Sequence, residues 1–214
     1  SAPYGVWAAS GEAAPVPWVD SRNVKFDVGA AVIARDTLGR PLESIVGARS
    51  VAFNQTTSQT FRSFGYPAVP TGDHDFDGTR LWACDSNPPI TDDSVGGAGD
   101  PTMGIGCDMT GGASGGGWVT ASGAVNGVNS YRYAGRPDLI FGPYFGSTIE
   151  ELYDFAAAEL PGVSGSWAVG NATAPASRAG TVRAAAACKK AKKRKRKLTR
   201  RARRCSRRHR DRRG

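Results

Sequence analysis

Residues 106–118 read Gly-Cys-Asp-Met-Thr-Gly-Gly-Ala-Ser-Gly-Gly-Gly-Trp, and this stretch is the most informative part of the 214-residue chain. A serine among glycines has a specific chemical use. A nucleophilic hydroxyl must be exposed on a tight turn, with backbone N–H groups that converge on the oxyanion as it forms. We therefore expect Ser114 to be a nucleophile and the N–H groups of Gly112 and Ser114 to form an oxyanion hole. The alternative is a flexible glycine loop that contains a serine by chance.

On both sides of this stretch, short apolar runs are separated by Gly, Pro, Asn and Asp, and the chain holds 28 glycines. This pattern predicts an all-β protein with many short strands. The predicted strands cover residues 24–33, 50–53, 60–64, 81–83, 117–121 and 124–131. Their spacing is typical of a β-barrel or a β-sandwich.

One helix is predicted near the end of the body. Ser147 precedes Glu150 by three residues, as in a capping box, and Pro161-Gly162 ends the pattern. The apolar residues at helical spacing are Ile149, Leu152, Tyr153, Ala156 and Leu160.

The C-terminal residues differ in composition from the body. Residues 161–187 are predicted to be a linker, and residues 188–214, with 17 Lys and Arg against one acid, to be a disordered basic tail of charge +16. The body is left with a charge of about −7. The tail could bind nucleic acid, anionic lipid headgroups or acidic cell-wall polymers, and charge alone does not separate these partners.

The four cysteines contain no Cys-x-x-Cys pair that would indicate zinc. We expect a disulfide between Cys84 and Cys107, which indicates an oxidising, extracellular compartment, and we leave the pairing of Cys188 with Cys205 open. The alternative is a pair of buried free thiols.

No cofactor or metal is expected. Asp73, Asp75, Asp77 and Gly78 repeat the start of a calcium loop, but Cys84 stands where the pattern needs a bidentate glutamate. An acidic surface loop is therefore the preferred interpretation of this segment.

Residues 112–116, Gly-Ala-Ser-Gly-Gly, followed by Gly-Trp-Val, resemble the Gly-Asp-Ser-Gly-Gly nucleophile motif of trypsin-like serine peptidases. Residues 26–32 resemble the strand that carries the triad aspartate, and residues 126–130 resemble the strand that lines the substrate cleft. Residues 3–7, 65–68 and 81–84 are similar to the bacterial glutamyl-endopeptidase-like branch. The resemblance covers residues 1–160.

The resemblance implies a secreted, monomeric serine endopeptidase with a double β-barrel fold that hydrolyses polypeptides through an acyl-enzyme. The remainder of a first, incomplete barrel would span residues 1–44, and a second barrel with the C-terminal helix would span residues 45–160. Ser114 would be the nucleophile, Asp27 would orient the catalytic histidine, and Ser130 would line the substrate site.

Neither histidine stands where the family places its base. His209 lies in the basic tail, and His74 falls between Asp27 and Ser114, whereas the family order is His, Asp, Ser. We expect the base upstream of Ser1 and the chain as given to be inactive. The alternatives are an inactive pseudoprotease and a protein that binds anionic surfaces or nucleic acid through its tail.

Three positions depart from related peptidases. Ala113 replaces the aspartate that pairs with the new N-terminus in trypsin, so that activation switch is absent. Asp108 occupies the position that selects Lys and Arg in trypsin and is a candidate substrate-binding residue with Ser130. Asn129 stands where glutamyl specificity usually relies on a histidine, so the preferred substrate side chain stays open.

Overall fold

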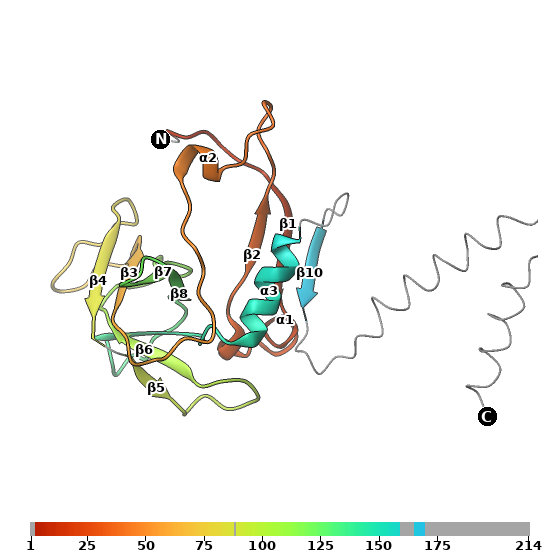
Figure 1. Cartoon of the computed structure of the whole chain (residues 1–214). Helices are drawn as coiled ribbons and strands as arrows, with labels where there is room; N and C mark the ends of the chain where they lie inside the picture. The colour runs from red at the N-terminus through yellow and green to blue at the C-terminus, as the bar shows by residue number, and fades with distance from the viewer. Residues whose placement is uncertain (1–2, 88, 159–164, 170–214) are drawn as a thin grey trace, which may run out of the picture. The chain divides into compact units, whose positions relative to one another are not determined.

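The computed structural model describes residues 3–87, 89–158 and 165–169 (Figure 1). The chain divides into two units, residues 1–171 and 172–214, and all of the described residues belong to the first. The predicted basic tail, with Cys188, Cys205 and His209, therefore lies outside the described residues. None of the helices in the described part combines the length and the apolarity needed to cross a membrane.

The N-terminal part forms a three-stranded sheet in the order β10-β1-β2. Strand β1 (Ala9–Pro15) pairs antiparallel with β2 (Ala30–Ile33) and parallel with β10 (Gly165–Val169). Between β1 and β2 lie the helix α1 (Val16–Ser21) and the 3-10 helix η1 (Val24–Phe26). The long helix α3 (Ser147–Ala157) packs against β1 and β2 (Figure 1).

Two further antiparallel sheets form the part that carries the serine. The first has the order β4-β3-β7-β8, and the second has the order β5-β6-β9. Their strands are β3 (Phe61–Gly65), β4 (Trp82–Ser86), β5 (Ile90–Asp92), β6 (Thr102–Gly106), β7 (Gly117–Thr120), β8 (Val125–Val128) and β9 (Leu139–Gly142). A short helix, α2 (Glu43–Val46), lies in the connection from β2.

One hydrophobic cluster joins these two sheets. Phe61 on β3 and Trp118 on β7 pack with Ile105 on β6 and Ile140 on β9, and all four side chains are at most 5% exposed. Trp118 is completely buried, and its ring lies 5.6 Å from that of Phe61, between centroids. The serine-bearing loop therefore emerges from the edge of a well-packed core.

The all-β prediction is confirmed in its coarse form, because the described residues are mostly strands and turns. The closed double barrel is not formed by the strand pairings within the described residues, which make three separate sheets. The predicted strands at 60–64, 81–83, 117–121 and 124–131 correspond to β3, β4, β7 and β8. Residues 50–53 contribute only an isolated bridge from Val51 to Val125.

The predicted strand over residues 24–33 is wrong in its first half. Val24–Phe26 is a 3-10 helix, begun by the Asn23 side chain, which accepts a hydrogen bond from the Lys25 backbone N–H at 3.1 Å. Lys25 Nζ donates to the carbonyl oxygens of Gly97 and Gly99 at 3.1 and 3.2 Å. These contacts with a distant loop override the local alternation of apolar residues, and Asp27 follows the helix as its C-cap.

The predicted capping box of the long helix is also wrong. Gly146 is the N-cap of α3, no side chain caps it, and Ser147 is already helical. The Glu150 carboxylate instead accepts a hydrogen bond from Asn54 Nδ2 at 2.8 Å. The helix itself is confirmed, and it buries Ile149 and Leu152 as its apolar spacing predicts.

Candidate active site

Ser114 lies on an exposed turn within the loop of residues 107–116, called the serine loop below, which connects β6 to β7. Gly112 has φ +102°, and a Cβ there would stand 2.6 Å from the Tyr66 carbonyl oxygen. Only glycine fits this backbone conformation without strain. The neighbouring Ala113 is 1% exposed, so the turn buries its methyl group and leaves Ser114 exposed.

Two backbone N–H groups of the serine loop are free to bind an anion. The Ala113 N–H donates to the Thr110 carbonyl at 3.2 Å, and the Gly116 N–H donates to the Ala113 carbonyl at 3.0 Å. By contrast, the N–H groups of Gly112 and Ser114 have no hydrogen-bond partner in the described part of the chain. The loop therefore keeps two donors, on either side of the buried Ala113, available for a ligand oxygen.

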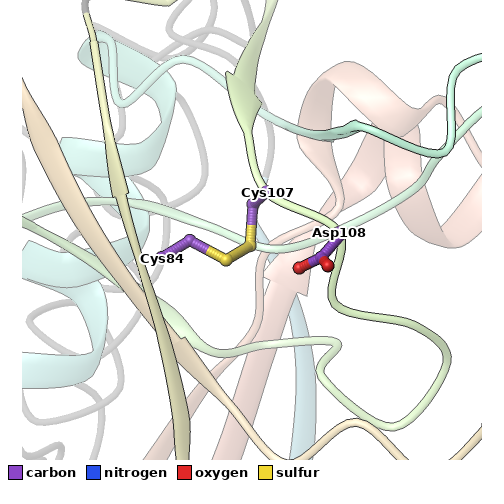
Figure 2. A group of neighbouring side chains, drawn as sticks. All are labelled: Cys84, Cys107 and Asp108. Carbon is purple, nitrogen blue, oxygen red and sulfur yellow. A yellow bond between two sulfur atoms is a disulfide. The ribbon is translucent and has the colours of Figure 1, made fainter. Parts of the chain in front are cut away.

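The first half of the serine loop is held by a disulfide and by the segment after β3. Cys107 is bonded to Cys84 on β4 with a Cα–Cα distance of 5.4 Å, which confirms the predicted pairing (Figure 2). The Gly111 carbonyl accepts a hydrogen bond from the Ala68 N–H at 2.7 Å, and Thr110 Oγ1 donates to the Val69 carbonyl at 2.7 Å.

Asn129 holds the second half of the loop and is 2% exposed. Its side-chain oxygen accepts hydrogen bonds from Trp118 Nε1 at 2.7 Å and Ser63 Oγ at 2.8 Å. Its Nδ2 donates to the carbonyl oxygens of Ala113, at 3.0 Å, and Phe64, at 3.1 Å.

The Asn129 backbone adds two further bonds to the same loop. Its carbonyl accepts from the Gly115 N–H at 2.8 Å, and its N–H donates to the Gly116 carbonyl at 2.9 Å. Asn129 thus contacts the residue before Ser114 and the two residues after it. It fixes the backbone on both sides of the serine.

Ser130, the next residue along the chain, contacts Asp27. Ser130 Oγ donates to Asp27 Oδ2 at 2.6 Å, across 103 residues of sequence. Both residues are half-buried, and the other Asp27 carboxylate oxygen has no hydrogen-bond partner among the described residues. The dipeptide Asn129-Ser130 therefore links the serine loop to Asp27.

A buried carboxylate supports the segment that follows Ser130, in which Tyr131 forms an isolated bridge with Phe141. Asp92, 8% exposed, accepts hydrogen bonds from the hydroxyls of Tyr131 and Tyr133, both at 2.8 Å, and from the backbone N–H of Ser94 at 2.9 Å. The Tyr131 hydroxyl also lies 2.5 Å from Thr102 Oγ1, and burial raises its pKa. Burial alone would raise the pKa of Asp92, but the hydrogen bonds from Ser94, Tyr131 and Tyr133 outweigh it and lower the pKa.

The lowered pKa makes this cluster sensitive to acid. A carboxylate with a folded-state pKa below its unfolded value stabilises the fold above the unfolded pKa, and that contribution is lost as the pH falls through the folded pKa. We expect the free energy of unfolding in urea to fall below about pH 4. We expect Asp92→Asn to be less stable than the parent at pH 7 and to lack part of this pH dependence.

Asp93→Asn is the matched control, because Asp93 is the exposed neighbour of Asp92. It should leave the unfolding profile unchanged. Equal pH dependence in the parent protein and in Asp92→Asn would show that the Asp92 hydrogen bonds contribute nothing.

The Asp108 carboxylate pairs with His74. Its Oδ2 lies 3.0 Å from His74 Nε2, and the His74 ring packs against Phe76 and Trp82. Figure 2 shows the Asp108 carboxylate close to the disulfide. Cys84, Cys107 and Asp108 gather within the span of a metal site, but their two sulfur atoms are bonded to each other and neither is a free thiolate.

The structure thus brings together most of the residues singled out in the sequence. Gly112 and Ser114 share one turn, and Ser130 contacts Asp27. Sequence reasoning missed the roles of Asn129 and Asp92, which become visible only through contacts with distant segments. The sequence position of Asn129 beside Ser130 was the one available signal, and its burial explains why its side chain has several hydrogen-bond partners.

Comparisons with known proteins agree with this geometry. The chain is similar to the protease Anisep from Arthrobacter nicotinovorans, with a TM-score of 0.64 and 36% identity over 74% of this chain and 70% of that one. It is equally similar to the thermostable serine protease AL20 from an extremophilic microorganism, with a TM-score of 0.63 and 36% identity over 73% and 70%.

A structure of a Glu endopeptidase in complex with MPD matches at 18% identity, with a TM-score of 0.55 over 74% of this chain and 67% of that one, and supports the fold alone. No family model and no curated protein matches the chain. The fold is mostly β and matches that of chymotrypsin-fold proteases. The chain belongs to the trypsin-like serine proteases.

Proposed function

We propose that this protein is a secreted serine endopeptidase in which Ser114 attacks the peptide carbonyl. One observation carries the proposal above all others. Asn129 is hydrogen-bonded to the serine loop, and the next residue along the chain, Ser130, is hydrogen-bonded to Asp27. An exposed serine with free N–H donors and a linked carboxylate has the parts that acyl transfer needs apart from the base.

The chemistry follows from these positions. Ser114 Oγ bonds to the substrate carbonyl carbon while its proton passes to a histidine. The N–H groups of Gly112 and Ser114 stabilise the negative oxygen of the tetrahedral intermediate. The histidine then protonates the leaving amine, the peptide C–N bond breaks, and water hydrolyses the acyl-enzyme by the reverse proton transfers.

Asp27 would hold that histidine through its free carboxylate oxygen, since Ser130 already occupies Oδ2. His74 does not suit the role, because its Nε2 is paired with Asp108 and its ring is packed between aromatic side chains. We therefore propose that the base is supplied by residues that precede Ser1. The same residues would complete the first barrel of a double-barrel fold.

The Cys84–Cys107 disulfide supports secretion, because structural disulfides persist in oxidising compartments. Ser130 and Asp108 would line the substrate cleft. The alternative is a pseudoprotease that keeps the fold without the base.

The test compares two forms of the protein on a denatured polypeptide substrate. We expect the protein as encoded, with any residues that precede Ser1, to hydrolyse the substrate, and the 214-residue chain alone to be inactive. Replacing the upstream histidine by alanine should abolish the activity. Hydrolysis by the 214-residue chain alone would overturn the assignment of the base, and an inactive protein as encoded would identify a pseudoprotease.

A further inference from the structure

The loop of residues 93–101, which connects β5 to β6 and is called the β5–β6 loop below, is bound by a lysine from the N-terminal part of the chain. Lys25 Nζ donates to the carbonyl oxygens of Gly97, at 3.1 Å, and Gly99, at 3.2 Å. Lys25 is half-buried and makes no ion pair in the described part of the chain. Its ammonium group therefore serves this loop.

The two neighbours of Lys25 contact the same loop. Asn23 Nδ2 donates to the Ala98 carbonyl at 3.1 Å. The Phe26 ring is 4% exposed and packs so closely on Gly99 that a Cβ there would stand 2.5 Å from Phe26 Cζ. Gly99 also has φ +103°, so only glycine fits at this contact without strain. Three residues of one short segment are thus bound to three consecutive residues of the β5–β6 loop.

This segment is the single 3-10 turn that leads into Asp27. Within the turn, the Phe26 N–H donates to the Asn23 carbonyl at 3.0 Å, and the Asp27 N–H donates to the Val24 carbonyl at 3.3 Å. One isolated turn has few internal hydrogen bonds to offset the cost of ordering its backbone. Its conformation, and with it the direction of the Asp27 side chain, therefore depends on the β5–β6 loop.

The β5–β6 loop is itself anchored beside the segment that binds the Asp27 side chain. Ser130 Oγ donates to Asp27, and the hydroxyl of the next residue, Tyr131, donates to Asp92 at 2.8 Å. Ser94, near the start of the loop, donates to the same Asp92 carboxylate through its backbone N–H at 2.9 Å and its Oγ at 2.5 Å. The contacts to the side chain and to the backbone of Asp27 thus come from elements that share one buried carboxylate.

We infer that Lys25 is a positioning residue for the peptidase reaction: by binding the β5–β6 loop, it fixes the turn that directs the Asp27 carboxylate toward the catalytic histidine. This inference rests on the proposed function, because it assigns Lys25 an effect through Asp27 and that histidine. A misplacement of about 1 Å in such a site can lower the rate on the order of 100-fold.

The test replaces Lys25 by methionine in the protein as encoded, which keeps a long apolar side chain and removes the donor. Amide hydrogen exchange, measured by NMR, reports on the N–H groups of Asp27 and Val28, which bond to the carbonyls of Val24 and Phe26. We expect both to exchange about 10-fold faster than in the parent protein. In peptide hydrolysis we expect kcat to fall about 10-fold, with KM changed by less than about twofold, because the reacting groups and not the bound substrate are misplaced.

Arg49→Met is the matched control. Arg49 is also a cation whose side chain binds a distant glycine, since its Nη1 donates to the Gly123 carbonyl at 3.1 Å, but it makes no contact with the turn before Asp27. This variant should keep the exchange rates at Asp27 and the kcat of the parent protein.

Two further variants complete the series. Lys25→Arg retains charged donors and should keep most of the parent kcat. Lys25→Gln retains a shorter, neutral donor and should change exchange and kcat in the same direction as Lys25→Met but less, so it carries the test if Lys25→Met fails to fold.

Unchanged exchange at Asp27 in Lys25→Met would overturn the inference. Faster exchange with the parent kcat would also overturn it, because Lys25 would then only stabilise the turn. The two proposals fail separately. Hydrolysis by the protein as encoded with an unchanged kcat in Lys25→Met would refute only the role of Lys25. An inactive protein as encoded would refute the peptidase function, and the exchange rates would then decide whether Lys25 positions Asp27.

Discussion

Replacing Ser114 by alanine is expected to lower kcat/KM for peptide hydrolysis by the protein as encoded on the order of 10⁴-fold or more, because no other group can form the acyl-enzyme. Substrate binding should change little, since the removed hydroxyl is exposed and makes no hydrogen bond in the described structure. The measurement is steady-state hydrolysis of a fluorogenic peptide, with the unfolding curve of each variant recorded alongside.

Ser58→Ala provides the control for Ser114→Ala. Ser58 is exposed and lies on a turn before β3, outside the site. Its replacement should leave both kcat/KM and the unfolding curve unchanged. If Ser114→Ala retained the activity of the parent protein, the nucleophile would have to be another residue.

Replacing Asn129 by alanine is expected to reduce the stability and the activity together. Three partners on the buried residues Ser63, Ala113 and Trp118, and one on the half-buried Phe64, would each lose a hydrogen bond. We expect the free energy of unfolding to fall by roughly 3 kcal/mol or more. We also expect kcat to fall about 100-fold in the fraction that remains folded, because Ser114 would lose its fixed position.

Asn126→Ala separates the two effects. Asn126 is 1% exposed and also makes two side-chain hydrogen bonds, to Gln59 and Ala52, but it does not contact the serine loop. This variant should lose stability while the folded fraction keeps the kcat of the parent protein. A kcat for Asn129→Ala as high as that for Asn126→Ala would mean that Asn129 only supports the core.

Local patterns predicted those parts of the fold in which neighbouring residues determine the structure. Strands β3, β7 and β8 are bounded by turn residues, and α3 shows helical spacing. The glycines around Ser114 predicted the exposed turn, because the φ of +102° at Gly112 is a local requirement. The Cys84–Cys107 bond followed from the cysteine positions.

Other features depend on contacts between distant residues, which no local pattern encodes. Strand β1 contains Gly11 and Pro15 and has no clear alternation, so it gave no signal before its pairing with β2 was known. The 3-10 helix before Asp27 depends on Lys25 reaching a loop more than 70 residues away. The importance of Asn129 arises from partners on β3, β7 and the serine loop.

We propose above all that Ser114 is an activated nucleophile and that Asn129 and Ser130 link its loop to Asp27. The most direct measurement treats the protein as encoded with a biotinylated fluorophosphonate, which reacts covalently with activated serines, and locates the adduct by peptide mass spectrometry. We predict a single adduct on Ser114 that appears as activity is lost. An active protein that carries no adduct, or carries it on a different serine, would contradict the account.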